Sequence, residues 1–150
     1  MTTSSGAWEA IRELLARYCE LVDAANWDEL GALFADGALA DPDGRVLAAG
    51  ADAVAAFYRR GTLLHDGSPR TTHVTANVII DLEPAGSEAQ VRSTYVVFQA
   101  APGAALQPII TGRYRDRVGQ DADGTWRFRE RRFLVDSVGD LSRHLAYELR

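Results

Sequence analysis

The feature that most constrains the fold is a change of hydrophobic period at Thr71. Before that residue apolar side chains recur every three or four positions, and after it they alternate, as in strands. The first alternating stretch, TTHVTANVIID, places His73, Thr75, Asn77 and Ile79 on one face and Val74, Ala76, Val78 and Ile80 on the other. The second face is hydrocarbon, whereas the first is typical of the wall of a polar-lined pocket. The alternative interpretation of His73 and Asn77 is a pair of satisfied polar groups at the rim of the core.

Three helices are expected before this point, over residues 7–24, 27–35 and 50–60, because their apolar residues share one helical face. A DPDG turn at residues 41–44 is expected to join two short strands. After it, residues 71–83, 88–100, 106–118 and 124–136 alternate and are separated by short turn-forming loops, which predicts antiparallel pairing. Helices followed by such a meander indicate an α+β fold with helices on one face of a curved sheet. The tail, residues 137–150, is interpreted as a short helix that closes the pocket mouth or packs on a neighbouring subunit.

Composition narrows the range of partners and cofactors. The net charge of −5 and the pI near 5.1 argue against nucleic acid or an anionic membrane as the main partner. One cysteine and three scattered histidines, at positions 65, 73 and 144, predict no disulfide framework, no metal site and no cofactor. Neither a signal peptide nor a membrane span is visible, so a cytoplasmic protein is expected. The length of 150 residues predicts one domain over residues 1–150.

Two polar side chains stand out on the first predicted helix. Tyr18 lies within its apolar stripe, and Asp23 follows five residues later. At about 100° per residue they are roughly 140° apart, so they share a cavity only if it is wide or the last helical turn is loosened. The alternatives are a core tyrosine with its hydroxyl at the edge and a solvated or capping aspartate.

The order of these segments resembles a known family. The run RYCELVDAANWDELGALFADGA, the helix after Gly50, TTHVTANVII, the GRYRD strand and the DGTWRFRERR strand are similar to the SnoaL-like branch of the nuclear transport factor 2-like superfamily. The resemblance extends over residues 8–136. It implies a cone-shaped α+β barrel, in which the curved, mostly antiparallel sheet wraps around the long first helix and a pocket lies between them. The superfamily holds dehydratases, isomerases, polyketide cyclases, epoxide hydrolases and binding modules, so the fold alone implies no reaction.

Within that branch the pattern is most similar to scytalone dehydratase and the bile-acid dehydratases. These enzymes keep a tyrosine and an aspartate on the first helix and a histidine on the first long strand, and Tyr18, Asp23 and His73 match those positions. Two features depart from the pattern. The next long strand offers Thr94, Tyr95 and Phe98 where those enzymes have another histidine or acid, and no clear match exists for an arginine near the end of the last strand.

The resemblance implies a cofactor-independent lyase or isomerase acting on a small apolar, ring-containing carbonyl or hydroxyl compound. His73 would be the base and acid, Asp23 its orienting carboxylate and Tyr18 the hydrogen-bond donor to the substrate oxygen. The residues expected to line the pocket and bind substrate are Asn77, Tyr95, Phe34, Phe57 and Arg131. The alternatives are a polyketide cyclase and a non-catalytic binding or assembly module of the same fold.

Two further expectations concern surfaces. Arg113, Arg115 and Arg117, and likewise Arg127, Arg129 and Arg131, alternate along neighbouring strands and are interpreted as solvated or subunit-facing ladders. Apolar outer positions such as Val74, Val78 and Ile80 would leave an exposed patch, which predicts a homo-oligomer, either dimer or trimer, built through the open sheet face.

Overall fold

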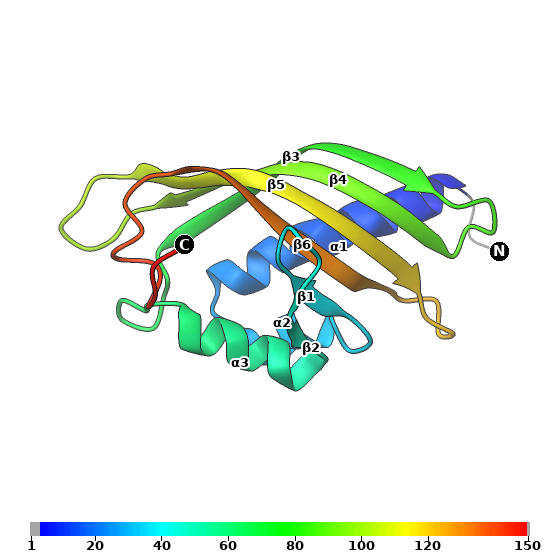
Figure 1. The fold of residues 1–150 in the computed structure, drawn as a ribbon, viewed down its shortest axis with the longest axis horizontal. Helices are drawn as coiled ribbons and strands as arrows, with labels where there is room; N and C mark the ends of the chain where they lie inside the picture. Colours follow the sequence, from blue (N-terminus) through cyan, green and yellow to red (C-terminus); the bar gives the residue numbers. More distant parts are fainter. Residues whose placement is uncertain (1–3, 150) are drawn as a thin grey trace.

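The computed structural model describes residues 4–149, so residues 1–3 and 150 of the expected domain and tail lie outside it. The helices are α1 (Ser4–Asp23), α2 (Trp27–Ala32) and α3 (Ala51–Gly61). The strands are β1 (Ala38–Ala40), β2 (Val46–Ala49), β3 (Thr71–Leu82), β4 (Glu88–Gln99), β5 (Gln107–Gln120) and β6 (Trp126–Val138). All three helices lie on one side of the sheet (Figure 1). The predicted α+β fold is therefore confirmed.

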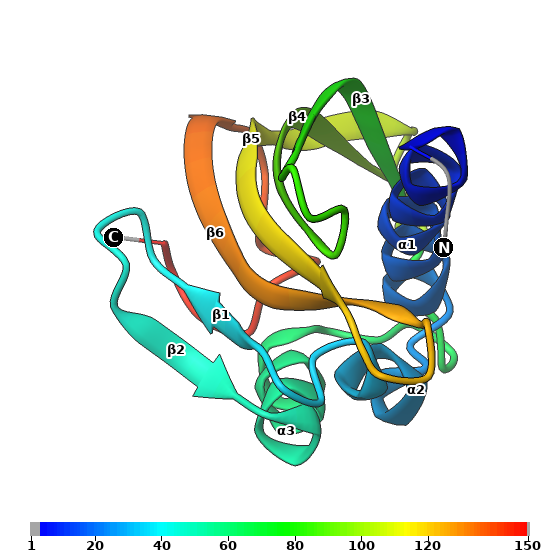
Figure 2. The ribbon, with the colours of Figure 1, turned by 90° about the vertical axis from the view of Figure 1, so that its right-hand side faces the viewer.

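The sheet has six strands in the order β2-β1-β6-β5-β4-β3. The four long strands pair antiparallel with their neighbours in sequence, whereas β1 runs parallel to β6. The sheet curls strongly, and α1 lies against β3 at its edge (Figure 2). Because the sheet is curved and mostly antiparallel, as expected, the inner faces of its strands converge on the space that α1 and α3 close.

One face of α1 supplies much of the core. Ile11, Leu15, Tyr18 and Val22 are at most 2% exposed and recur every three or four residues. Burying a large apolar side chain of this kind contributes about 1.5 to 3 kcal/mol. This helix is therefore held by its packing against the sheet, and the direction of its last turn, where Asp23 lies, is fixed with it.

Strand β3 contains an irregularity that corrects the predicted faces. The backbone φ of Asn77 is 53°, a left-handed conformation that asparagine adopts more readily than most residues, and the β3–β4 register shifts between Ala76 and Ile79. His73 keeps its predicted inward face, but after Asn77 the order is reversed. Val78 and Ile80 pack on the core, whereas the Asn77 side chain is exposed.

The expectation that Asn77 lines the pocket is therefore wrong, and so is the placement of Val78 and Ile80 on the outer face. Val74 and Ile79, which are 42% and 45% exposed, remain as large apolar residues on the open side of β3. The homo-oligomer remains a prediction, and the exposed apolar patch that supports it is smaller than expected.

The C-terminal tail is not helical within the described residues. Beyond β6 the chain forms turns and crosses back to the end of α3, where Thr62 and Leu145 form an isolated bridge. The backbone N–H of Leu63 donates to the carbonyl of His144 at 2.8 Å. The tail thus borders the cavity as a turn and not as a helix, and its backbone finds partners at the end of α3 and on the α3–β3 connection.

None of the helices in residues 4–149 combines the length and the apolar character needed to cross a membrane.

Candidate active site

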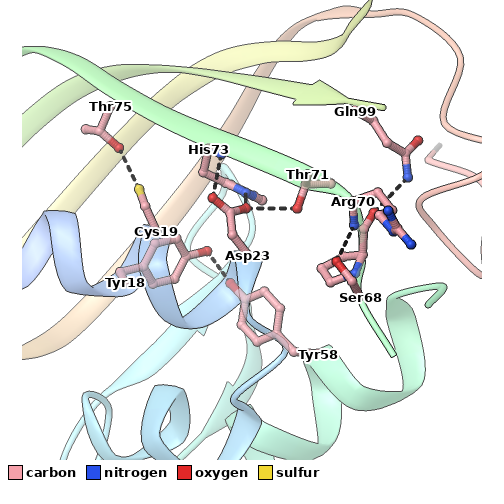
Figure 3. A network of polar contacts seen from close by, with 11 residues as sticks. Tyr18, Cys19, Asp23, Tyr58, Ser68, Arg70, Thr71, His73, Thr75 and Gln99 are labelled. Atoms are coloured by element: carbon pink, nitrogen blue, oxygen red, sulfur yellow. Dashed lines mark hydrogen bonds and ion pairs between the residues drawn. The ribbon is translucent and has the colours of Figure 1, made fainter. Parts of the chain in front are cut away.

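A carboxylate and an imidazole meet where α1 ends beside β3 (Figure 3). The Nδ1 atom of His73 donates to Oδ1 of Asp23 at 2.6 Å. The same carboxylate accepts the backbone N–H of His73 at 2.9 Å and the hydroxyl of Thr71 at 2.8 Å. Three donors from one strand therefore fix the carboxylate, and the carboxylate fixes the tautomer of His73 with its proton on Nδ1.

The two partners differ in what they face. Asp23 lines a groove between α1 and β3 together with Arg12, Cys19 and Glu20, and it does not line the main cavity. His73 borders both spaces. Tyr18 and Asp23 were expected to lie roughly 140° apart around the helix, which would let them share a cavity only if it were wide or the last turn loosened. Neither condition is needed, because Asp23 does not border the cavity and acts on it only through His73.

The main cavity has a volume of about 700 Å³ and is predominantly apolar. Its wall is formed by Tyr18, Asp41, Pro42, Leu47, Phe57, Tyr58, His73, Tyr95, Val97, Ile110, Tyr114, Phe133, Val135, Val138, His144, Leu145, Tyr147, Glu148 and Leu149. The imidazole of His73 is only 8% exposed, and its Nε2 atom has no hydrogen-bond partner among residues 4–149. A basic nitrogen with a fixed tautomer is thus available to a ligand in an aromatic, poorly hydrated space.

Tyr18 supplies a second polar group to this wall. Its hydroxyl is hydrogen-bonded to the hydroxyl of Tyr58 on α3 (Figure 3). Each phenol carries one O–H, and the hydrogen bond between them uses only one of the two. Burial raises the pKa of both phenols, although the nearby Arg131 cation opposes this shift. Both stay protonated at neutral pH, so one O–H remains to donate to a ligand.

Sequence reasoning placed Tyr58 on the helix but gave it no role at the site. Its position beside Phe57 carried only a packing signal. The spacing of aromatic residues on one helix says nothing about which hydroxyl will meet another across the cavity.

Of the predicted lining residues, Phe57 and Tyr95 border the cavity. The Tyr95 ring stacks on Tyr114 with centroids 4.3 Å apart. Its hydroxyl lies over Gly112, where a side chain would collide with it, and is directed towards the carbonyl of Leu134. Tyr95 therefore offers its ring to the cavity, and its hydroxyl belongs to the sheet.

Two other predicted lining residues are buried beneath the wall. Phe34 is 0% exposed and stacks on Phe128 with centroids 4.7 Å apart. Arg131 is also 0% exposed, and its Nε and Nη2 atoms donate to the Asp116 carboxylate at 2.9 and 2.8 Å. Neither side chain lines the cavity, so both expectations of substrate contact are corrected.

The prediction that Arg131 belongs to a solvated or subunit-facing ladder of arginines is also wrong. The β5–β6 register shifts between Arg117 and Val118, so that Phe128 and Arg131 both reach the inner side. The Arg131 guanidinium lies 4.2 Å from the centroid of Tyr18 and 3.7 Å from that of Tyr114. Burial alone would lower the pKa of Arg131, but the Asp116 carboxylate outweighs it, and the pKa is raised.

A second imidazole in the wall was missed. His144 in the tail is 7% exposed, and its ring centroid lies 6.4 Å from that of His73. Burial, and then the charge of His73, lower the pKa of His144 to about 4. The linear spacing of 71 residues between the two histidines gave no signal of this contact, because no periodic pattern fixes the path of an irregular tail.

Comparisons with known proteins agree with this architecture. The SnoaL-like domain model matches residues 4–132. A search of curated proteins finds no match. Among solved structures, a Mycobacterium tuberculosis protein described as of unknown function is 28% identical, with a TM-score of 0.70 over 86% of this chain and 71% of that one.

Two structures from Novosphingobium aromaticivorans are also similar. One is described as an NTF2-like protein with a cystatin-like fold and is 26% identical, with a TM-score of 0.70 over 90% of this chain and 85% of that one. The other is described as a putative scytalone dehydratase and is 24% identical, with a TM-score of 0.72 over 95% of this chain and 89% of that one. At 24% identity, the similarity to this second structure shows the fold alone.

Proposed function

Because the chain belongs to the SnoaL-like domain family of the nuclear transport factor 2-like superfamily, we propose that it is a cofactor-independent dehydratase or isomerase. Its substrate would be a small apolar, ring-containing carbonyl or hydroxyl compound. The observation that carries the proposal is the His73–Asp23 pair, in which Nδ1 is held at 2.6 Å by a carboxylate and Nε2 opens onto an aromatic cavity.

This geometry suits proton transfer next to a carbonyl group. In a dehydration, Nε2 of His73 takes the proton from the carbon beside the carbonyl, and the electron pair of that C–H bond forms the enolate. The tyrosine pair donates a hydrogen bond to the enolate oxygen. The enolate then expels the β-hydroxyl, which leaves as water with the proton that His73 returns, and an enone remains.

Asp23 supports this cycle from outside the cavity. Its carboxylate keeps the first proton on Nδ1, so that Nε2 is free to act as a base, and it offsets the charge when the ring becomes an imidazolium. Positioned acid–base catalysis contributes about 10² to 10⁴-fold. The mechanism therefore suits a proton that a carbonyl already acidifies, as in a β-hydroxy ketone.

Two other functions fit the same fold and predict different behaviour. A polyketide cyclase would use similar proton transfers on a longer substrate. A non-catalytic binding or assembly module would use the aromatic wall for affinity alone. The free Nε2 beside a fixed carboxylate favours the enzyme, because a buried polar pair costs stability that a binding wall does not need.

The test uses the β-hydroxy ketone formed from benzaldehyde and acetone, which loses water to give benzylideneacetone, detected by its ultraviolet absorbance. We expect His73→Ala to lower turnover by about 10² or more, with little change in the affinity for benzylideneacetone. Thr72→Ala is the matched control, because this neighbour on β3 is exposed on the outer side. Binding without turnover in the wild-type chain would instead identify a binding module.

A further inference from the structure

The cavity wall contains a buried imidazole that the proposed cycle leaves unused, that of His144. The residue is 7% exposed. Its Nδ1 atom is buried with no hydrogen-bond partner, and no side-chain hydrogen bond joins Nε2 to any residue in the range 4–149. Buried polar groups are nearly always paired, so an imidazole without partners in a cavity wall calls for a ligand.

The chain holds this ring in place through its neighbours. Gln99 donates through Nε2 to the carbonyl of Arg143 at 2.9 Å, and a ring nitrogen of His65 lies 2.7 Å from the same oxygen. The backbone N–H of His144 donates to Leu141, and its carbonyl accepts from Leu63. The backbone of Arg143 and His144 is thus anchored without use of the imidazole, which leaves the ring itself available for recognition.

His144 differs from His73 in its surroundings. His73 has a carboxylate partner at 2.6 Å, whereas His144 has none in the described part of the chain and lies 6.4 Å from the His73 ring between centroids. Its pKa, lowered to about 4 first by burial and then by the charge of His73, keeps it neutral at neutral pH. A neutral imidazole donates a hydrogen bond through one nitrogen without adding a second positive charge to the cavity.

We propose that His144 is a second oxyanion donor of the site, a neutral imidazole that binds the carbonyl oxygen of the substrate while His73 removes the neighbouring proton. The inference rests on the proposed function, since it assigns a role within that reaction. Both rings line one cavity, so a ligand whose carbonyl and acidic carbon are adjacent reaches both. The substrate class is thereby narrowed to ketones and related carbonyl compounds whose acidic proton is on the carbon next to the carbonyl.

The test compares two probes that need the same base but differ in the oxygen that becomes negative. The first is the β-hydroxy ketone of benzaldehyde and acetone, which reacts through an enolate. The second is a nitrobenzisoxazole, which opens to a nitrophenolate when a base takes its ring proton and forms no enolate. His144→Phe keeps an aromatic ring without a donor, and His144→Gln keeps an N–H. Ser142→Ala is the control, since this exposed tail residue bonds only to Asp140 among the described contacts.

We expect His144→Phe to lower turnover of the ketone by about 10²-fold, the typical loss of one oxyanion donor, and to leave the nitrobenzisoxazole reaction within a few fold. His144→Gln should recover part of the ketone activity, and Ser142→Ala should match the wild type with both probes. Equal losses on both probes, or no recovery with glutamine, would overturn the role, because a merely structural histidine has no preference for a carbonyl.

If the wild-type chain turns over neither probe, the proposed function fails and the inference is judged separately. Nitrogen NMR of the labelled imidazoles then follows the addition of benzylideneacetone. A shift of the His144 nitrogens that is absent with the hydrocarbon propenylbenzene supports carbonyl recognition by this ring. An unchanged His144 resonance at saturating benzylideneacetone overturns it.

Discussion

Two carboxylates near the cavity each bind a nitrogen-containing side chain, one pair fully buried and the other partly exposed. Asp116 and Arg131 are both 0% exposed and joined by two hydrogen bonds. The Asp23 and His73 side chains are 23% and 8% exposed, and one face of the imidazole opens onto the cavity. The sealed pair holds a permanent charge beneath the aromatic rings, whereas the open pair holds an imidazole that the proposed cycle uses as base and acid. Solvent and ligand access therefore separates a structural pair from one suited to catalysis.

The largest effect should come from the sealed pair. Asp116→Asn leaves the Arg131 guanidinium buried without a counter-charge, and breaking such a pair costs about 3 to 5 kcal/mol of unfolding free energy. Urea unfolding at neutral pH measures the change.

The matched control is Asp136→Asn, because Asp136 bonds Arg113 at 2.9 Å with both side chains more than 40% exposed. That exposed pair should contribute under about 1 kcal/mol. Similar losses for the two variants would break the distinction between sealed and open pairs.

His144 is a third case, because it is buried with no carboxylate bonded to its ring in residues 4–149. Its folded pKa of about 4 lies below the ordinary 6.5, so the unfolded chain binds the proton more tightly. The stability that follows is present above pH 6.5 and is lost as the pH falls towards 4. The charges of His73 and Asp23 act on its pKa in opposite directions, and Asp41 and Glu148 lie in the same cavity wall.

From about pH 7 to about pH 4 the wild-type chain should lose on the order of 3 kcal/mol more unfolding free energy than His144→Gln. This figure is the free energy that corresponds to the difference between the unfolded and folded pKa values of His144. Urea unfolding of both proteins at the two pH values measures the difference. Parallel losses would show that burial does not lower the pKa of His144 in the folded chain.

The sequence predicted the open pair and misplaced the sealed one. The alternation of β3 fixes the face of His73 because nothing interrupts it between Thr71 and Thr75. At Asn77 one left-handed residue reverses the face, and the only available signal was that asparagine tolerates this conformation. The β5–β6 register shift between Arg117 and Val118, which turns Arg131 inward, was not predicted, because the arginines of β6 alternate regularly up to Arg131 in the sequence.

The contacts made by Tyr58 and His144 depend on how α3 and the tail approach the sheet. Those approaches are set by tertiary packing and not by any local pattern. The family resemblance therefore predicted the part of the candidate site that lies on α1 and β3, while the part contributed by α3 and the tail needed the structure.

The most direct test of the open pair is a double-mutant cycle on Asp23 and His73, measured as kcat/KM for dehydration of the β-hydroxy ketone of benzaldehyde and acetone. Asp23 acts on the cavity only through His73, so His73→Ala and Asp23→Asn should each lower kcat/KM by about 10² or more. The double variant should then be scarcely worse than His73→Ala, because no ring remains for the carboxylate to orient. Fully additive losses would contradict the account, since they would show that Asp23 contributes to the reaction without His73.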